Sequence, residues 1–247
     1  MKRQTFIRYS QMLLFCLAVA FFAAIFGIFQ FAFDDAANKE ASLSFDVPLG
    51  LTVVIDAGHG GEDGGAVGIS GVYEKDINLE ISSLLYDMFG LTQLDVVMTR
   101  DGDYLLYEAG QESRKKFNDL NNRINKCNSY DNPLLISIHQ NRFPIEKYKG
   151  LQVWYSKNDP SSKALAESIQ GKTAMYLQPE NKRQTKQAGR NIFILHRAEF
   201  PAVLVECGFL SNAEEEKMLC DKDYQKRVAF LIFSSVMDYI TSQPEMN

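Results

Sequence analysis

Three polar residues that can bind a metal or move a proton follow directly on apolar runs of the sequence. His59 comes after VVIDAG, His139 after LLISI, and Glu206 after AVLV. If these runs are strands of one parallel sheet, the residues just past their carboxyl ends line a single crevice. Two imidazoles with nearby carboxylates are typical of a metal-dependent hydrolase that keeps one metal position open for water. The pattern therefore predicts one site built from distant parts of the chain.

The first of these residues lies in a glycine cluster, GHGGEDGG at residues 58–65. Glycine permits backbone conformations that are closed to other residues, and it lets a ligand approach the backbone closely. The cluster does not fit the dinucleotide pattern GxGxxG, and no GK[ST] follows it to hold a phosphate. HExxH and GxSxG are absent as well. The sequence thus excludes a nucleotide loop, a helix-borne zinc protease motif and a serine-elbow hydrolase.

A third metal ligand is expected near the same sheet edge. Glu74 follows the loop GISGVY and opens a predicted helix, so its side chain can point back over the edge. Glu62 and Asp63 in the glycine cluster compete for this role. As a first-turn residue, Glu74 could instead simply favour the positive end of its helix. Spacing alone leaves the choice open.

Glu206 remains for proton transfer. A carboxylate in the apolar run PAVLVECG is costly unless it is paired or used, and hydrolysis at a metal needs a nearby base. The alternative is a salt bridge to Arg190 or Arg197.

Two further residues are candidates for substrate contact. Asn141 lies two positions after His139 and could hold the substrate or a developing oxyanion, although it could equally form a turn. His196 also follows a strand-like run, and we assign it to the substrate cleft or to a structural role rather than to the metal.

Apolar runs alternate with segments of helical period along the rest of the chain. Val, Ile and aromatic residues predict strands at 51–56, 94–99, 134–138, 151–155, 192–195 and 202–206. Apolar residues recurring every three or four positions predict helices at 74–89, 117–127, 161–177 and 223–240. This alternation predicts an α/β fold with a single open, mostly parallel sheet and helices on both of its faces.

The amino-terminal part of the chain has a different composition from the rest. Residues 12–33 form a stretch of 22 positions in which Gln30 is the one strongly polar residue, enough to span a bilayer as a helix. Three basic residues and no acid accompany this stretch, so the bulk of the chain is expected on the outer face of the membrane. We predict a signal or membrane-anchor segment at 1–33, favouring an uncleaved anchor because no A-x-A pattern follows it. A linker at 34–50 and one catalytic domain at 51–242 complete the predicted organisation.

The charge of the remaining residues restricts the partners. They carry 23 basic against 31 acidic residues. An acidic body of this kind is a poor nucleic-acid binder, and it does not favour capture of other anionic polymers. Any recognition of such a polymer is expected to depend on local groove contacts.

Four blocks of the sequence carry a family resemblance: IDAGHGGEDGGAVG, GVYEKDINL, LLISIHQN and PAVLVECGFLSN. In this order they resemble the zinc-dependent N-acetylmuramoyl-L-alanine amidases, which cut between muramic acid and the stem peptide of peptidoglycan. The last two blocks are similar to the germination-specific branch, which helps to form muramic lactam in the spore cortex. The resemblance implies Zn²⁺ on His59, Glu74 and His139, Glu206 as the catalytic residue, and a six-stranded sheet.

The resemblance also implies partners and a location. It predicts an exported enzyme that acts on peptidoglycan at the outer face of the membrane, and it allows control by an activating accessory protein. Gln140 and His196 depart from many members of the family, whereas the four proposed zinc and catalytic positions match it. Two other functions stay open: a wall-binding protein of the same fold without turnover, and a zinc peptidase that cuts within the stem peptide.

Overall fold

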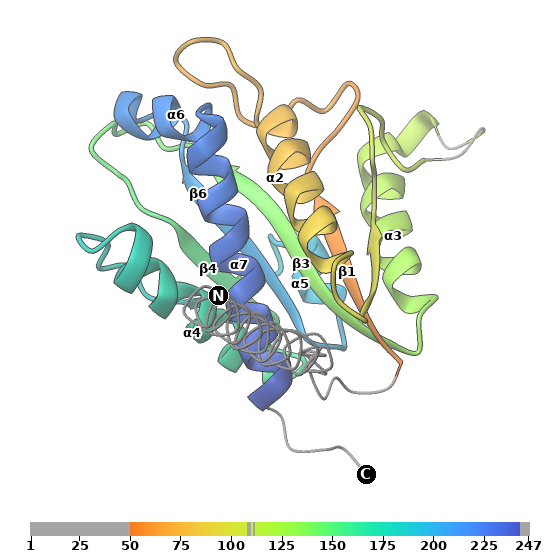
Figure 1. Ribbon diagram of the computed structural model, residues 1–247. Coiled ribbons are helices and arrows are strands. Elements are labelled where there is room, and N and C mark those ends of the chain that lie inside the picture. The colour runs from red at the N-terminus through yellow and green to blue at the C-terminus, as the bar shows by residue number, and fades with distance from the viewer. Residues whose placement is uncertain (1–49, 108–109, 111, 243–247) are drawn as a thin grey trace, which may run out of the picture. The chain divides into compact units, whose positions relative to one another are not determined.

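The computed structural model of the protein describes residues 50–107, 110 and 112–242 (Figure 1). The predicted apolar helix at 1–33 and the predicted linker, apart from Gly50, lie outside these residues, so the division of the chain at 33, 50 and 242 stays a prediction. None of the helices in the described part has the length and hydropathy of a membrane span.

One open sheet of six strands forms the centre of the described part, which confirms the α/β class. The strands are β1 (Leu51–Ala57), β2 (Asp95–Met98), β3 (Asn132–Asn141), β4 (Gln152–Tyr155), β5 (Lys186–Gln187) and β6 (Ala202–Phe209). Their order across the sheet is β2-β1-β3-β6-β4-β5. The strand that precedes His59 and the strands that contain His139 and Glu206 are therefore direct neighbours at the centre of the sheet.

The prediction of a mostly parallel sheet is wrong, because the sheet is mixed. β2, β1, β3 and β6 run parallel, whereas β4 is antiparallel to β6, and β5 follows β4. The cause is the short connection from β3 to β4, residues 142–151, which contains no helix. A parallel neighbour needs a crossover of about a dozen residues or more. β4 therefore starts at the edge where β3 ends and runs back.

Helices cover both faces of the sheet, as predicted (Figure 1). One face packs against α2 (Glu74–Phe89), α4 (Ser161–Lys172) and α7 (Lys222–Ser242), and the other against α3 (Lys115–Asn128) and α5 (Phe193–Arg197). Side chains alternate between the two layers, since Val53 and Ile55 belong to the first core and Val54 to the second. Three short helices complete the fold: η1 (Glu112–Arg114), the π-helical η2 (Thr173–Leu177) and α6 (Ala213–Leu219).

Two local predictions need correction. Residues 192–195 were expected to form a strand, but Ile192 precedes α5 and residues 193–195 belong to it, because a run as short as IFIL has no period that separates helix from strand. The sixth strand is instead the two-residue β5, whose exposed polar side chains give no strand signal. The helix predicted at 161–177 is α-helical only to Lys172 and then widens into η2.

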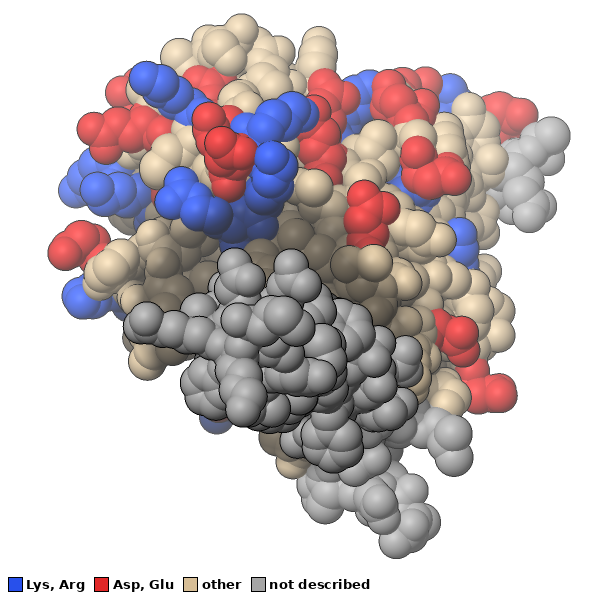
Figure 2. Space-filling model, in the orientation of Figure 1, with Lys and Arg blue, Asp and Glu red and all other residues tan. Residues whose placement is uncertain are grey.

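Charged side chains of both signs are mixed on the face shown in Figure 2. Lys and Arg lie among Asp and Glu over α6 and the beginning of α7. No single sign dominates this part of the surface.

The buried carboxylate of Asp56, near the end of β1, links three parts of the structure: the segment after β2, strand β3 and helix α3. Asp56 Oδ1 accepts hydrogen bonds from Thr99 Oγ1 and from Arg123 Nη1, both at 2.7 Å, and its Oδ2 accepts one from Ser137 Oγ at 2.6 Å. Burial alone would raise the pKa of Asp56, but the Arg123 charge and the two hydroxyls lower it to about 2. This network fixes the end of β1 against β3, α3 and the segment after β2.

Replacing Asp56 by asparagine will destabilise the protein at pH 7 by about 3 kcal/mol or more, because it leaves the Arg123 charge buried without its partner. The folded-state pKa of Asp56 lies below its ordinary value of 3.8. Its contribution is therefore present above that value and is lost as the pH falls towards 2.

Urea unfolding of wild type and Asp56→Asn at a series of pH values checks this, with the exposed Asp223→Asn as a control that should change little. A difference in unfolding free energy that does not shrink between pH 4 and pH 2 would contradict the assignment.

Candidate metal centre and active site

His59, Glu74 and His139 meet at the carboxyl edge of the central strands. One ligand atom of each lies within 4.8 Å of the others. His59 follows β1, His139 lies near the end of β3, and Glu74 reaches the edge from the first turn of α2. The two imidazoles are 19% and 20% exposed and the carboxylate 5%, so a small molecule can reach the cluster from solvent. The arrangement is a candidate metal site.

The carboxylate of Glu74 is the centre of this cluster. Its Oε1 lies 3.3 Å from His59 Nε2 and 2.8 Å from His139 Nδ1, while its Oε2 accepts a hydrogen bond from the Ala66 backbone N–H at 2.7 Å. Burial would raise the pKa of Glu74, but the hydrogen bonds and charges of the two histidines hold it far below its ordinary value. Glu74 is thus an ionised carboxylate aimed at both imidazoles.

The backbone of His59 has a φ of 62°, the only positive value at a non-glycine residue in the described part of the chain. Such a conformation is strained, and it persists only where the surroundings enforce it. Asp63 Oδ2 lies 3.0 Å from His59 Nδ1 and fixes the other side of the ring. Burial lowers the pKa of His59, but Asp63 and Glu74 together raise it to about 9.

The two acids of the glycine cluster that were alternatives to Glu74 as the third metal ligand make other contacts. Asp63 supports the outer nitrogen of His59 and does not belong to the three-residue cluster, and Glu62 pairs with Lys115 at the surface.

Two buried arginines hold the turn that carries His59. Arg123 donates to the carbonyl oxygens of Ala57 (2.8 Å) and His59 (2.7 Å). Arg100 donates to those of Ala57 (2.8 Å) and Gly58 (3.0 Å). Sequence reasoning missed both arginines. The only signal was the pair Asp119 and Arg123 at helical spacing, which does not reveal the turn that they hold.

Two glycines of the turn make room for the cluster. A Cβ on Gly58 would lie 2.3 Å from the His139 ring. A Cβ on Gly65 would lie 2.6 Å from Glu74 Oε2 and 2.7 Å from the His59 ring. These positions accept only glycine while the three side chains keep their places.

Glu206 stands beside His139 in the register of β3 and β6, with both side chains on the face covered by α3 and α5. Its Oε2 is buried and has no hydrogen-bond partner in the described structure. Burial is the main cause that raises the pKa of Glu206 to about 7, and the negative charge of Glu74 adds to it. No arginine contributes, so the proposed pairing with Arg190 or Arg197 does not form.

Comparison with known proteins identifies the family. A sequence model described as N-acetylmuramoyl-L-alanine amidase matches residues 53–238. The chain belongs to the N-acetylmuramoyl-L-alanine amidase family. It is accordingly an enzyme of peptidoglycan hydrolysis, as the four sequence blocks predicted.

Individual relatives agree along most of the chain. The germination-specific N-acetylmuramoyl-L-alanine amidase of Bacillus subtilis is 32% identical over 90% of this chain and 92% of its own length. The CwlD amidase of Clostridioides difficile, solved in complex with the GerS lipoprotein, is 35% identical with a TM-score of 0.74, covering 78% of this chain and 99% of that one. The catalytic domain of CwlV from Bacillus (Paenibacillus) polymyxa is 32% identical with a TM-score of 0.65, over 78% and 99% of the two chains.

Asn141, a candidate for substrate contact, and its neighbour Gln140 have different surroundings. Asn141 ends β3, past a shift in register after His139, and its side chain makes no hydrogen bond within the described residues. Gln140 is buried: its backbone N–H donates to Glu74 Oε1 at 3.0 Å and its side chain to Asn78 at 3.1 Å. Gln140 therefore supports Glu74 and does not face the substrate.

His196 is not brought to the cluster. It lies in α5, and its carbonyl oxygen accepts a hydrogen bond from Asn158 at 2.9 Å. Asn158 follows the end of β4, which runs towards the opposite edge of the sheet from His139. A substrate role for His196 stays a prediction without support from its position.

Replacing Gly58 by alanine will weaken the binding of Zn²⁺ to the amidase by about tenfold or more, because the added Cβ must displace the His139 ring. The matched control is Gly171→Ala, since nothing lies within 4 Å of a Cβ built there. Competition with a chromophoric chelator gives the affinities, and circular dichroism verifies that both variants are folded. Equal affinities for wild type and Gly58→Ala would show that His139 is not a ligand.

Proposed function

We propose that the amidase is a zinc enzyme in which His59, Glu74 and His139 hold the metal and Glu206 is the catalytic residue. Two imidazole nitrogens and one carboxylate form a donor set that suits zinc with an open position. The observation that carries the proposal is the buried, unpartnered Oε2 of Glu206 beside His139. A buried polar atom without a partner is costly, and use of Oε2 by the reaction would explain why it is retained beside His139.

A zinc ion bound there would supply Lewis-acid polarisation of the amide carbonyl and make water nucleophilic near neutral pH. The protein side chains do the rest. Asp63 accepts from His59 Nδ1 and so leaves Nε2 free to act as a ligand atom. Glu206 takes a proton from the attacking water at Oε2 and passes it to the nitrogen of the leaving L-alanine. Asn141, with its unused amide, holds the substrate at the end of β3.

The biological role that we propose is maturation of spore-cortex peptidoglycan for germination, where removal of the stem peptide precedes formation of muramic lactam. Its support is the likeness to the germination-specific enzyme over most of both chains. We further propose that the enzyme is exported, tethered through residues 1–33 to the outer face of the membrane, and assisted by an accessory protein. The solved complex of the CwlD amidase with a lipoprotein supports this last point.

Replacing Glu206 by glutamine will lower the turnover of muropeptides by about 10²- to 10⁴-fold, because the variant has no carboxylate to move the proton. Zn²⁺ affinity should remain close to that of wild type, since Glu206 is not one of the three ligands. Turnover that is unchanged in Glu206→Gln would reject the catalytic role.

Product masses separate the amidase from the two alternative functions. The wild-type protein, loaded with Zn²⁺, should release intact stem peptides that begin with L-alanine, and a chelator should stop the reaction until Zn²⁺ is restored. Peptides cut internally would indicate a peptidase. Binding to the wall without any product at any Zn²⁺ concentration would indicate a wall-binding protein.

A further inference from the structure

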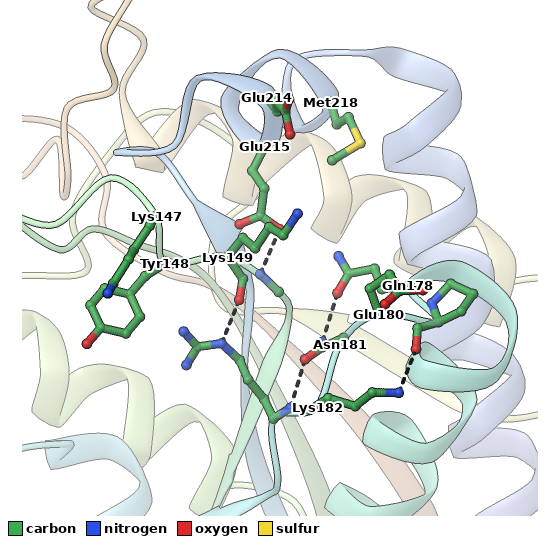
Figure 3. A pocket seen from close by; sticks show the side chains of 13 residues that line it. Lys147, Tyr148, Lys149, Gln178, Glu180, Asn181, Lys182, Glu214, Glu215 and Met218 are labelled. Carbon is green, nitrogen blue, oxygen red and sulfur yellow. Dashed lines mark hydrogen bonds between the residues drawn. The ribbon is translucent and has the colours of Figure 1, made fainter.

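A pocket of about 540 Å³ lies one strand beyond the catalytic glutamate (Figure 3). Residues 147–150, residues 178–183 and α6 surround it. Because β4 is antiparallel to β6, the start of β4 lies at the same sheet edge as the carboxyl end of β6. The pocket therefore borders the edge that holds the candidate metal site, although none of its residues belongs to that site.

Four cations line this pocket: Lys147, Lys149, Lys182 and Arg183. None of them forms an ion pair with a carboxylate in the described part of the chain. Three acids also line the pocket, Glu180, Glu214 and Glu215. The buried one, Glu215, already accepts two backbone N–H groups at 2.8 Å, from Gly150 and Phe209. The four cations therefore leave a small excess of positive charge in the pocket, on a chain with more acidic than basic residues.

Arg183 connects the pocket to the row of side chains that includes Glu206 and crosses the sheet from β6 to β4. Its Nη1 donates to Gln152 Oε1 at 3.1 Å, and Gln152 stands opposite Glu206 in the register of β4 and β6. Its Nε donates to the Lys149 carbonyl oxygen at 2.8 Å, and its guanidinium lies 4.5 Å from the centre of the Phe209 ring. Three of its five N–H groups remain for a ligand, in an orientation that the stacking fixes.

We propose that this pocket binds a carboxylate of the stem peptide, on the leaving-group side of the amide. The proposal rests on the amidase function of the neighbouring site. Guanidinium and ammonium groups prefer carboxylates, and the peptide part of the substrate ends in one. Two strand spacings, about 10 Å, separate β6 from the outer strand β5, and about three extended residues cover that distance. The peptide then runs from Glu206 across β4 to Arg183.

Two synthetic substrates test the proposal: an N-acetylmuramoyl tetrapeptide with free carboxylates, and the same compound with every carboxylate amidated. The test variants are Lys149→Gln, Lys182→Gln and their combination. Each single change should raise KM for the free acid by about 2- to 5-fold, and the combination by about tenfold, with kcat little changed. KM for the amidated substrate should stay near the wild-type value in all three variants.

The matched control is Lys226→Gln on α7, an exposed lysine outside this pocket, which should leave both substrates unaffected. Arg183→Gln is a fourth variant with a larger expected effect, and its unfolding temperature must be measured because Arg183 also holds Gln152. Equal KM changes for the two substrates, or no change in the double variant, would overturn the proposal.

If wild type cleaves neither substrate, the proposed function has failed, and the pocket is then tested by calorimetric binding of the free-acid compound. Binding that is weakened about tenfold in the double variant supports the pocket. Binding that is equal in wild type and the double variant overturns it.

Discussion

Two buried guanidinium groups, those of Arg100 and Arg123, hold the turn on which the whole site depends. A positive charge inside a protein is tolerated only when it is paired and hydrogen-bonded. Here Asp56 and Asp119 compensate the charge of Arg123. Backbone carbonyl oxygens accept the other N–H groups of the two arginines: those of Ala57, Gly58 and His59 in the turn, and those of Gly102 and Lys75 outside it. The need to satisfy these buried donors forces the backbone of His59 into a conformation that an isolated chain would avoid.

The register of the sheet positions Glu206, just as the two arginines position the turn that carries His59. His139, Glu206 and Gln152 form one row across β3, β6 and β4, all on the same face. These three side chains are thus spaced by the strand separation alone, without any loop to position them. Glu74 reaches the cluster over the sheet edge from α2, in the opposite layer. Only His59 lies on a turn, and the two arginines hold that turn, which suits a reaction that tolerates little misplacement.

Sequence reasoning found the residues whose signal is local and missed those whose role exists only in the folded chain. His59, His139 and Glu206 could be found because each follows an apolar run of the sequence, and the choice of Glu74 over Asp63 needed the family resemblance. The reversal of β4 was readable from the short 142–151 connection but was overlooked. The roles of Arg100 and Arg123 could not be predicted, because the local sequence does not show which distant backbone carbonyl groups an arginine side chain will contact in the folded protein. The strand predicted for the run IFIL was wrong, since four apolar residues are compatible with either a helix or a strand.

The reversed strand has a consequence for how such enzymes diversify. From 142 to 187 the chain leaves the central strands, builds β4, α4, η2 and β5, and returns without contributing a ligand to the cluster. Most of the outer wall of the cleft is thus encoded in one uninterrupted stretch, which lies between the part of the chain that carries His59, Glu74 and His139 and the part that carries Glu206. Exchange of that one stretch between relatives would alter which peptide is accepted while the reacting groups are inherited unchanged.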